Sequence, residues 1–386
     1  MVTLTNAENV LKTVYLDAIT EQLNTGVSPF FSKVIKTAND VYGGEIRKMV
    51  TYGINGGIGA TSETGTLPKA SSANRAEFVL PLKNLYGTIE LSDKAIRASE
   101  HSNAAFVSLL EAEINSLLTS AKYNFCRMLM GDAKGTLATV KSQTGTSIVV
   151  DSTRCVMEGM LVDVISLNTN ATLATGLKIT DVDRVNNKIT VSGTINSAGF
   201  TAGDFLIMQG SYNKELSGLA HICSTTSSLY GVNRSQNKWI KPFVTQSEDI
   251  SEVIIQKSID RVADTHGSQV DMIVCSNGVK RAYQDYLITN KANVDYVDLD
   301  GLKAISVGGI PMVADRFCNE GRMYLLDTSD FGLHQLCDWR WIEGDSGNVL
   351  RQMGNQPVYS ATLVKYAELM CYRPGGQAVI DGITEA

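Results

Sequence analysis

The best candidate for a catalytic nucleophile in this sequence is Ser346, within Gly344-Asp345-Ser346-Gly347. A serine hydroxyl attacks an acyl carbon when a histidine takes its proton and an aspartate orients that histidine. His221, in Ala220-His221-Ile222-Cys223, and many aspartates supply these residue types. The chemistry would be acyl transfer or hydrolysis. Residue types alone do not make a triad, because a triad is defined by its geometry and Asp-Ser-Gly is also an ordinary tight turn.

The segment around Ser346 matches the tetrapeptide at the nucleophile of chymotrypsin-like proteases, but the rest of the chain does not favour that class. Those enzymes are built from two β-barrels, which leave no place for the long helix predicted below. We therefore favour the turn. A serine hydrolase that uses Ser346 is kept as the alternative from a different functional class.

Two further patterns could bind ligands, and each favours a structural interpretation. Residues 53–59 are glycine-rich, yet they lack the Gly-Lys-Ser/Thr ending of a phosphate-binding loop and no helix is expected to follow. Asp295, Asp298 and Asp300 precede Gly301 without the late glutamate of a calcium loop. We read the first as a projecting loop and the second as a surface turn.

Histidines and cysteines do not form a metal-binding pattern. The four histidines are scattered, and the seven cysteines include no C-x-x-C pair and no histidine at zinc spacing. The thiols are typical of a reduced, cytoplasmic setting. We predict no catalytic residues, no cofactor and no metal.

Composition narrows the class of protein. The 386 residues are more than one average core holds, and 44% are hydrophobic against 19% charged, which favours extensive burial and assembly. The formal net charge is −6 and no basic block occurs, so tight binding of nucleic acid is not expected. The sequence has neither the start of a secretory signal nor a run of eighteen apolar residues, which excludes this route of secretion and predicts no membrane span.

The element that organises the chain is a long helix over residues 103–130. Apolar residues recur there at spacings of three and four, from Phe106 and Leu110 through Phe125 and Met128. At 1.5 Å per residue this helix is roughly 40 Å long. Gly131 is expected to end it in a left-handed conformation. So long a helix can serve as a spine for other layers.

Two segments before the spine are expected to reach outward. Residues 7–23 carry an apolar stripe of helical periodicity, and Phe30 and Phe31 follow as aromatic residues that would need a partner surface. Residues 45–52 and 75–82 are predicted strands, with the glycine-rich residues 53–59 and a Ser/Thr-rich tip between them. A ribbon of this kind cannot bury itself, so it is predicted to project onto a neighbouring molecule.

After the spine the sequence returns to strands and then to mixed structure. Short strands over residues 135–212, with a turn at Asn186-Asn187, predict a small barrel or sandwich inserted into a larger body. Residues 247–266 and 277–289 are predicted helices around a buried strand at 271–276, and residues 358–372 form a long strand. The fold class is α+β.

This order of elements resembles the Hong Kong 97-type fold of tailed-phage major capsid proteins, over most of the chain. Local phrases carry the same resemblance. They are Val41-Tyr42-Gly43-Gly44-Glu45-Ile46-Arg47-Lys48, Asn84-Leu85-Tyr86-Gly87-Thr88-Ile89-Glu90-Leu91-Ser92-Asp93-Lys94-Ala95-Ile96, Leu229-Tyr230-Gly231-Val232-Asn233-Arg234-Ser235, Val307-Gly308-Gly309-Ile310-Pro311-Met312-Val313-Ala314-Asp315 and Tyr324-Leu325-Leu326-Asp327. The inserted β-rich part is similar to the extra domain of some of these shells.

The resemblance implies a division of the chain into seven parts. In chain order they are an N-terminal arm (1–40), an extended β-ribbon loop (41–83), a peripheral domain with the spine helix (84–134), an inserted β-barrel-like domain (135–213), a peripheral/axial connection (214–264), an axial α/β domain (265–335) and C-terminal peripheral strands (336–386).

The function implied is that of a shell subunit forming hexamers and pentamers of the icosahedral head around phage double-stranded DNA. Scaffold, portal and decoration proteins are expected partners, with DNA near the wall by non-specific proximity, no membrane, and assembly in the host cytoplasm. Because the chain begins at the arm, scaffolding is expected from a separate protein or an earlier cleavage. A cellular nanocompartment shell of the encapsulin kind is the alternative within the fold.

The residues expected at contacts between subunits lie in the arm and the ribbon. They are Phe30, Phe31, Gly56, Gly57, Glu63, Lys69 and Arg75. Some relatives join their subunits covalently through a lysine of the extended loop, and Lys69 lies near this tip. No pattern identifies a partner asparagine, so we interpret Lys69 as an exposed or ion-paired lysine.

Overall fold

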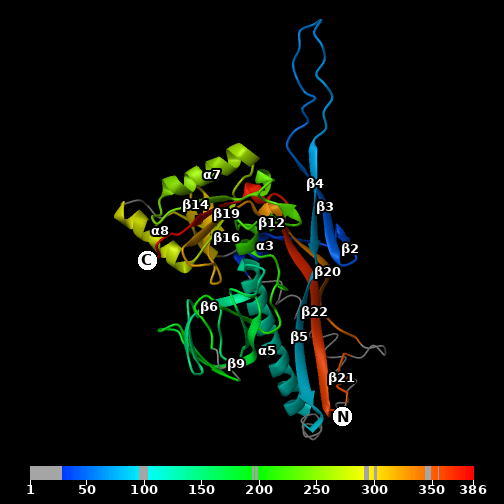
Figure 1. Cartoon of the computed structure of the whole chain (residues 1–386), viewed down its shortest axis with the longest axis vertical. Coiled ribbons are helices and arrows are strands. Elements are labelled where there is room, and N and C mark those ends of the chain that lie inside the picture. The colour runs from blue at the N-terminus through cyan, green and yellow to red at the C-terminus, as the bar shows by residue number, and fades with distance from the viewer. Residues whose placement is uncertain are drawn as a thin grey trace.

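The computed structural model describes residues 28–94, 103–193, 195, 199–290, 295–299, 302–343, 349–354 and 356–386. The stripe predicted for residues 7–23, the motif around Ser346, and Asp300 therefore lie outside the described residues. Figure 1 shows an elongated molecule with a ribbon projecting at one end, a layered α/β body beside its base, and a separate barrel beside the long helix. No helix of the described part is long and apolar enough to cross a membrane.

The longest sheet is organised around β22 (Val358–Cys371), the strand predicted near the C-terminus. It pairs antiparallel with β20 (Phe331–Trp341) and with β5 (Lys83–Ser92), and β1 (Ile35–Thr37) runs parallel to β20. The short β21 (Arg351–Gln352) also pairs with β22. Ala361, Leu363 and Leu369, which share the face predicted from the sequence, are buried in the main core. From Leu363 to Cys371 the opposite face of β22 is largely buried as well.

The predicted spine helix is α5 (Asn103–Met130), which packs against β5 (Figure 1). Leu117 lies so close to Gly87 of β5 that a Cβ there would come within 2.8 Å of Leu117 Cδ1. A side chain at this position would force the end of Leu117 to move, so glycine lets the helix pack closely on the strand. Farther along the helix, Phe125 and Leu129 are buried in the main core.

The end of the spine corrects one prediction. The helix ends at Met130, but Gly131 is absent from the residues with a left-handed backbone, and Ala133 has a φ of 66° instead. The close packing at this helix end depends on Gly218, which has no side chain. A Cβ on Gly218 would lie 2.5 Å from Gly131 N and 2.3 Å from Met128 O, so the helix end and the segment before α6 (Leu219–Ile222) touch backbone to backbone.

The inserted β-rich part is a closed barrel with the strand order β10-β7-β6-β11-β8-β9. In chain order its strands are β6 (Thr136–Thr144), β7 (Ser147–Val150), β8 (Leu161–Ile165), β9 (Thr172–Asp183), β10 (Lys188–Ser192) and β11 (Phe205–Met208). Asn187 takes the left-handed turn conformation predicted for Asn186-Asn187, with a φ of 49°. The barrel has its own core, which includes Ile148, Leu177 and Leu206.

The α/β body holds a seven-stranded sheet of order β14-β23-β19-β15-β18-β17-β16. Its strands are β14 (Phe243–Gln246), β15 (Met272–Cys275), β16 (Tyr296–Leu299), β17 (Leu302–Val307), β18 (Ile310–Ala314), β19 (Arg322–Leu326) and β23 (Ala378–Asp381). In β15, Ile273 and Cys275 face a core shared with helices α7 (Glu252–His266) and α8 (Asn277–Thr289), whereas Met272 and Val274 face the main core. Both helices thus cover one face of the sheet.

The seven-stranded sheet extends beyond residues 265–335, the range predicted for the axial domain. β14 and α7 precede it, and β23 comes from the C-terminal part that was expected in the peripheral domain. β14 and β23 pair in parallel, Phe243 opposite Ala378 and Gln246 opposite Asp381. Pairing across more than a hundred residues depends on the whole fold, which local sequence patterns do not record.

Candidate assembly surface

The ribbon consists of β3 (Glu45–Tyr52) and β4 (Asn74–Pro81), with the short β2 (Val41–Tyr42) beside β3. β3 and β4 pair in continuous register from Glu45 opposite Pro81 to Tyr52 opposite Asn74. Residues 53–73 join them and extend beyond the rest of the molecule (Figure 1). The glycine-rich residues 53–59 thus belong to the loop that joins the two strands, as the projecting-loop interpretation predicts.

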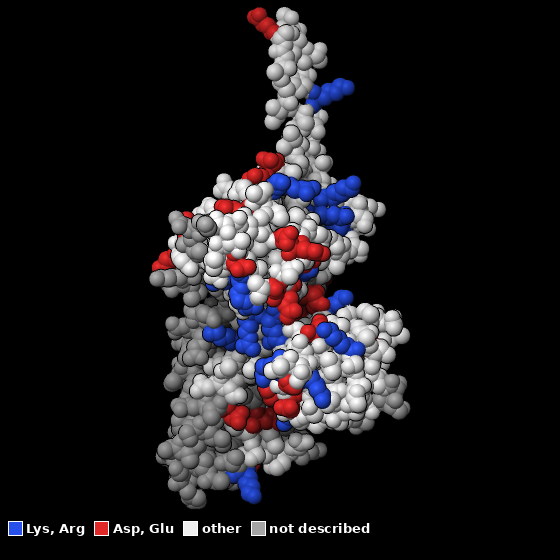
Figure 2. Space-filling view, turned by 90° about the vertical axis from the view of Figure 1, so that its left-hand side faces the viewer, with Lys and Arg blue, Asp and Glu red and all other residues white. Residues whose placement is uncertain are grey.

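The projecting end of the ribbon exposes large apolar side chains. Ile54, Ile58 and Leu67 have 90%, 87% and 79% of their surface exposed. Figure 2 shows that this end is mostly uncharged, whereas acidic and basic residues are interspersed over the body. Burying such a side chain contributes about 1.5–3 kcal/mol, so three of them make the end of the ribbon a strong site for contact with another surface.

The charged residues predicted for the ribbon are exposed and available for contact. Glu63, Lys69 and Arg75 are exposed, and they form no ion pair with the described residues. Gly57 also lets the two sides of the loop approach each other. A Cβ at this position would lie 3.3 Å from Ser71 N and 3.4 Å from Lys69 O, across the loop. Gly56 beside it is exposed.

Phe30 and Phe31 correct the expectation of exposed aromatic residues. Both lie in the short α3 (Pro29–Lys33) and are 0% and 2% exposed. The Phe30 ring packs edge-on against Phe331 at 5.2 Å, and the Phe31 ring against Phe125 at 5.1 Å. These aromatic side chains anchor the arm inside its own subunit, so they are not free to contact a neighbour.

The base of the ribbon is held by an aromatic stack. Trp239, in the short helix η2 (Lys238–Ile240), stacks on Tyr52 of β3 with centroids 4.3 Å apart, and is nearly parallel to Phe78 of β4 at 5.9 Å. Val79 N donates to Tyr230 O nearby. The stack connects both strands of the ribbon to the α/β body, and so sets the direction in which the ribbon projects.

We expect Trp239→Ala to loosen the ribbon without unfolding the body. Because Trp239 is half-buried, the loss of stability should be about 2 kcal/mol, below the range for a fully buried tryptophan. Hydrogen exchange of the amides in β3 and β4 should accelerate about tenfold or more. Trp239→Phe keeps a stacking ring and should change exchange much less. Equal exchange in the parent chain and both variants would show that the stack does not hold the ribbon.

A buried histidine fixes the segment that enters the ribbon. His334 of β20 is 0% exposed; its Nδ1 lies 2.9 Å from Asn39 O and its Nε2 lies 3.0 Å from the Tyr372 hydroxyl. A carbonyl only accepts, so Nδ1 carries the proton and Nε2 accepts from Tyr372. Burial lowers the pKa of His334, which favours this neutral form. Lys48 of β3 adds an ion pair to Asp40 at 3.0 Å and lies 4.2 Å from the centroid of the Tyr372 ring.

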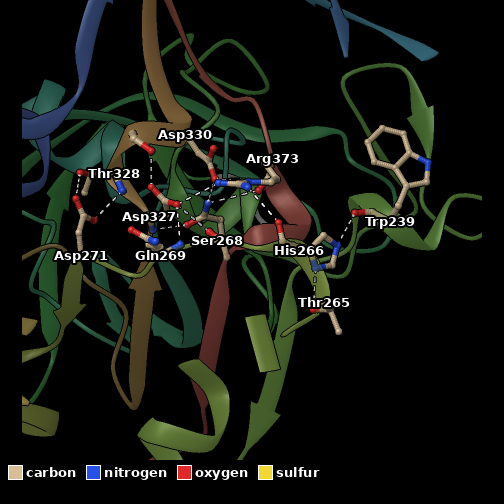
Figure 3. Close-up of polar contacts among 12 residues, drawn as sticks. Trp239, Thr265, His266, Ser268, Gln269, Asp271, Asp327, Thr328, Asp330 and Arg373 are labelled. Carbon is tan, nitrogen blue, oxygen red and sulfur yellow. Dashed lines mark hydrogen bonds and ion pairs between the residues drawn. The ribbon is translucent and has the colours of Figure 1, made fainter. Parts of the chain in front are cut away.

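A polar cluster joins the long sheet to the α/β body, and Figure 3 shows it converging on Arg373. Arg373 follows β22 and donates to Asp330, to Asp327 and to His266 O, at 3.0, 3.1 and 3.1 Å. Ser268 Oγ and Gln269 N donate to Asp327, each at 3.0 Å. The cluster therefore connects the ends of β19 and β22 with the segment after α7.

Burial and hydrogen bonds act in opposite directions on the pKa of these aspartates. Burial acts to raise the pKa of Asp327, but the donors Ser329, Gln269 and Ser268 and the Arg373 charge outweigh it, so the pKa of Asp327 is lowered. Burial dominates at Asp330, whose pKa is raised despite Arg373. Asp271 accepts from Thr328 N and Oγ1 at 2.8 and 2.5 Å. With their oxygens occupied by protein donors, these carboxylates act as a structural joint.

No group of acidic, histidine and cysteine residues suited to a metal occurs among the described residues. Asp295 and Asp298 are exposed at the start of the β16 hairpin, and Asp300 lies outside the described part. His221 is in α6, where burial lowers its pKa; its position relative to Ser346 is not described.

A buried carboxyl on β22 was missed by sequence reasoning. Glu368 is 1% exposed, and burial raises its pKa to about 7 although Ser217 N and Leu369 N donate to it at 2.7 and 3.0 Å. The folded chain therefore binds this proton more tightly than the unfolded chain. The free energy of unfolding should fall as pH rises from about 4.5 to about 7, and stay level above that.

Glu368→Gln should remove this dependence on pH. The amide oxygen can still accept from Ser217 N and Leu369 N, and no charge is buried at any pH. We expect the variant to be more stable than the parent by about 1–3 kcal/mol at pH 8, and nearly equal at pH 4.5. Urea unfolding of the unassembled chain at both pH values measures this. A variant that is less stable at pH 8 would contradict the assignment.

Comparisons with known proteins test the fold. No protein-family model matches the sequence, and a search of curated proteins found no match. Among solved structures, the capsid subunit of cyanophage A-1(L) aligns over 92% of this chain and 91% of its own, with 13% identity and a TM-score of 0.54. The chain has the Hong Kong 97-type fold.

Two other solved structures align over similar lengths at lower TM-scores. The SrpI encapsulin of Synechococcus elongatus covers 93% of this chain and 89% of its own, with 10% identity and a TM-score of 0.46. The capsid of a native GTA particle covers 92% and 90%, with 10% identity and the same TM-score.

Proposed function

We propose that the chain is the major capsid protein of a tailed double-stranded DNA phage. It has a structural role: copies associate into hexamers and pentamers that close into an icosahedral head. The observation that carries the proposal is the projecting ribbon, whose Ile54, Ile58 and Leu67 are largely exposed in the described part of the subunit. A loop that leaves its subunit in this way makes head-to-tail contacts, and such contacts close into rings.

The ribbon also supplies the polar part of the proposed contact. Glu63, Lys69 and Arg75 would pair with charges on the next subunit, while Gly56 and Gly57 let the loop lie flat on it. Each exposed ion pair contributes only about 0.2–1 kcal/mol, so the apolar residues provide most of the affinity and the charges select the register. The net charge of −6 lets DNA pack inside without adhering to the wall.

The remaining partners and the absence of catalysis belong to the same proposal. A scaffold protein would guide assembly in the host cytoplasm, and a portal and a decoration protein would join the shell of the virion. The carboxylates of the polar joint are occupied by protein donors, which supports a non-catalytic role.

The test is size-exclusion chromatography with negative-stain electron microscopy on the purified chain, alone and with a co-expressed scaffold. Shells, tubes or rings of five or six subunits are expected. Nuclease-protected DNA inside particles from infected cells would separate a phage head from a nanocompartment that holds protein. A monomer under every condition would refute the proposal, and a Ser346→Ala change that abolished a measured hydrolysis would replace it with the hydrolase.

A further inference from the structure

A cleft of about 840 Å³ lies where the spine helix, β5 and the barrel meet. Leu85 of β5 and Leu117, Ala121, Phe125 and Met128 of α5 form its apolar wall. Figure 1 shows α5 between the long sheet and the barrel, so elements from three parts of the chain border this space. The stretch of α5 from Leu117 to Met128 is roughly 17 Å long, the length of about three helical turns.

Two residues that line the cleft carry polar atoms that find no partner among the described residues. Asn124 Oδ1 and Trp339 Nε1 are shielded from water and make no hydrogen bond within this part of the chain, and Trp339 is only 5% exposed. An unpaired buried donor or acceptor costs about 1–3 kcal/mol. A segment that occupies the cleft and carries hydroxyl or amide groups can supply both partners, which a purely apolar occupant cannot.

The first described residues lead to a contact with Phe125, one of the residues that line the cleft. Ser28 Oγ donates to Asp315 at 2.9 Å, and three residues later the Phe31 ring contacts Phe125, a cleft residue, at 5.1 Å. The apolar stripe predicted before it ends at Leu23. Five residue steps separate Leu23 from Ser28, and they span at most roughly 18 Å. The stripe is therefore tethered within reach of the cleft in its own subunit.

We propose that residues 7–23 bind in this cleft of their own subunit as an amphipathic helix. Val10, Leu11, Val14 and Ala18 would cover the apolar wall, and the Tyr15 hydroxyl can both donate and accept toward the unpaired groups. The charges agree with this placement. The segment carries Glu8, Asp17 and Glu21 against Lys12, while Lys83 and Lys214 line the cleft and make no ion pair with the described residues.

Photo-crosslinking of the full chain tests the proposal. Ser120 is exposed and lines the cleft, whereas Thr119, the next residue of the helix, is exposed and does not. With p-benzoylphenylalanine at position 120, crosslinks to residues 7–23 are expected, at least five times more often than from position 119. Chains with and without ¹⁵N are mixed before irradiation, so that crosslinked peptides reveal whether one chain or two contributed.

Substitutions in the stripe provide the matched control. Leu11→Asp with Val14→Asp changes the face proposed to bind, and should reduce crosslinking from position 120 at least fivefold. Thr13→Asp with Thr20→Asp changes the opposite face and should leave it within twofold of the parent. Crosslinks to residues 7–23 of a second chain, to the ribbon tip of a second copy, or only to the barrel would each overturn the proposal. The result does not depend on whether shells form.

Discussion

Ile54→Asp, Ile58→Asp and Leu67→Asp together should abolish assembly while leaving the subunit folded. Each parent side chain would contribute about 1.5–3 kcal/mol when buried by a neighbour, so the triple change removes at least about 4 kcal/mol from each contact. That free energy corresponds to about a thousandfold weaker association. We expect rings and shells to disappear from electron micrographs, and the chain to elute as a monomer at concentrations that assemble the parent.

The matched control is Val185→Asp, at the β9–β10 turn of the barrel. Val185 is 91% exposed, like Ile54, but lies away from the ribbon. The Val185→Asp variant should assemble as the parent does. The melting temperature of both variants should stay within about 2 °C of the parent, because exposed side chains contribute little to the folded state. Normal shells from the triple variant would contradict the role given to the ribbon.

Arg127→Met should cause the largest loss of subunit stability. Arg127 of α5 donates from both terminal nitrogens to the Glu215 carboxylate, at 2.9 and 2.5 Å, and both side chains are 3% exposed. Removing the guanidinium leaves a buried carboxylate with no counter-charge, which costs about 3–5 kcal/mol. Urea unfolding of the unassembled chain gives the difference directly.

The double variant Arg127→Met with Glu215→Leu distinguishes a lost ion pair from lost packing. With no charge left to bury, it should recover most of the stability, since hydrophobic replacements of buried pairs are often neutral. This pair joins the end of the spine to the segment that leaves the barrel, so the barrel should become more susceptible to proteolysis at residues 209–215 in the single variant. A double variant as unstable as the single one would show that the guanidinium acts through its packing.

Local patterns in the sequence were sufficient to predict most elements of this fold. The three-and-four spacing of α5 and the period-two alternation of β4 record which face of each element is buried, because one face of a packed element must be apolar. The pair Asn186-Asn187 predicted a hairpin turn, and Asn187 has the positive φ of such a turn in the barrel. The resemblance to tailed-phage capsid proteins placed these elements in the order that the comparison with the cyanophage subunit supports.

Only the tertiary structure decided which side chains meet. Phe30 and Phe31 looked like surface aromatics, but Phe331 and Phe125 cover them from segments far along the chain. Arg127 and Glu215 are residue types that usually lie on surfaces, and each is buried because it pairs with the other. The apolar period of a segment is a local property, whereas burial of a charge depends on a partner that folding brings to it from elsewhere in the chain.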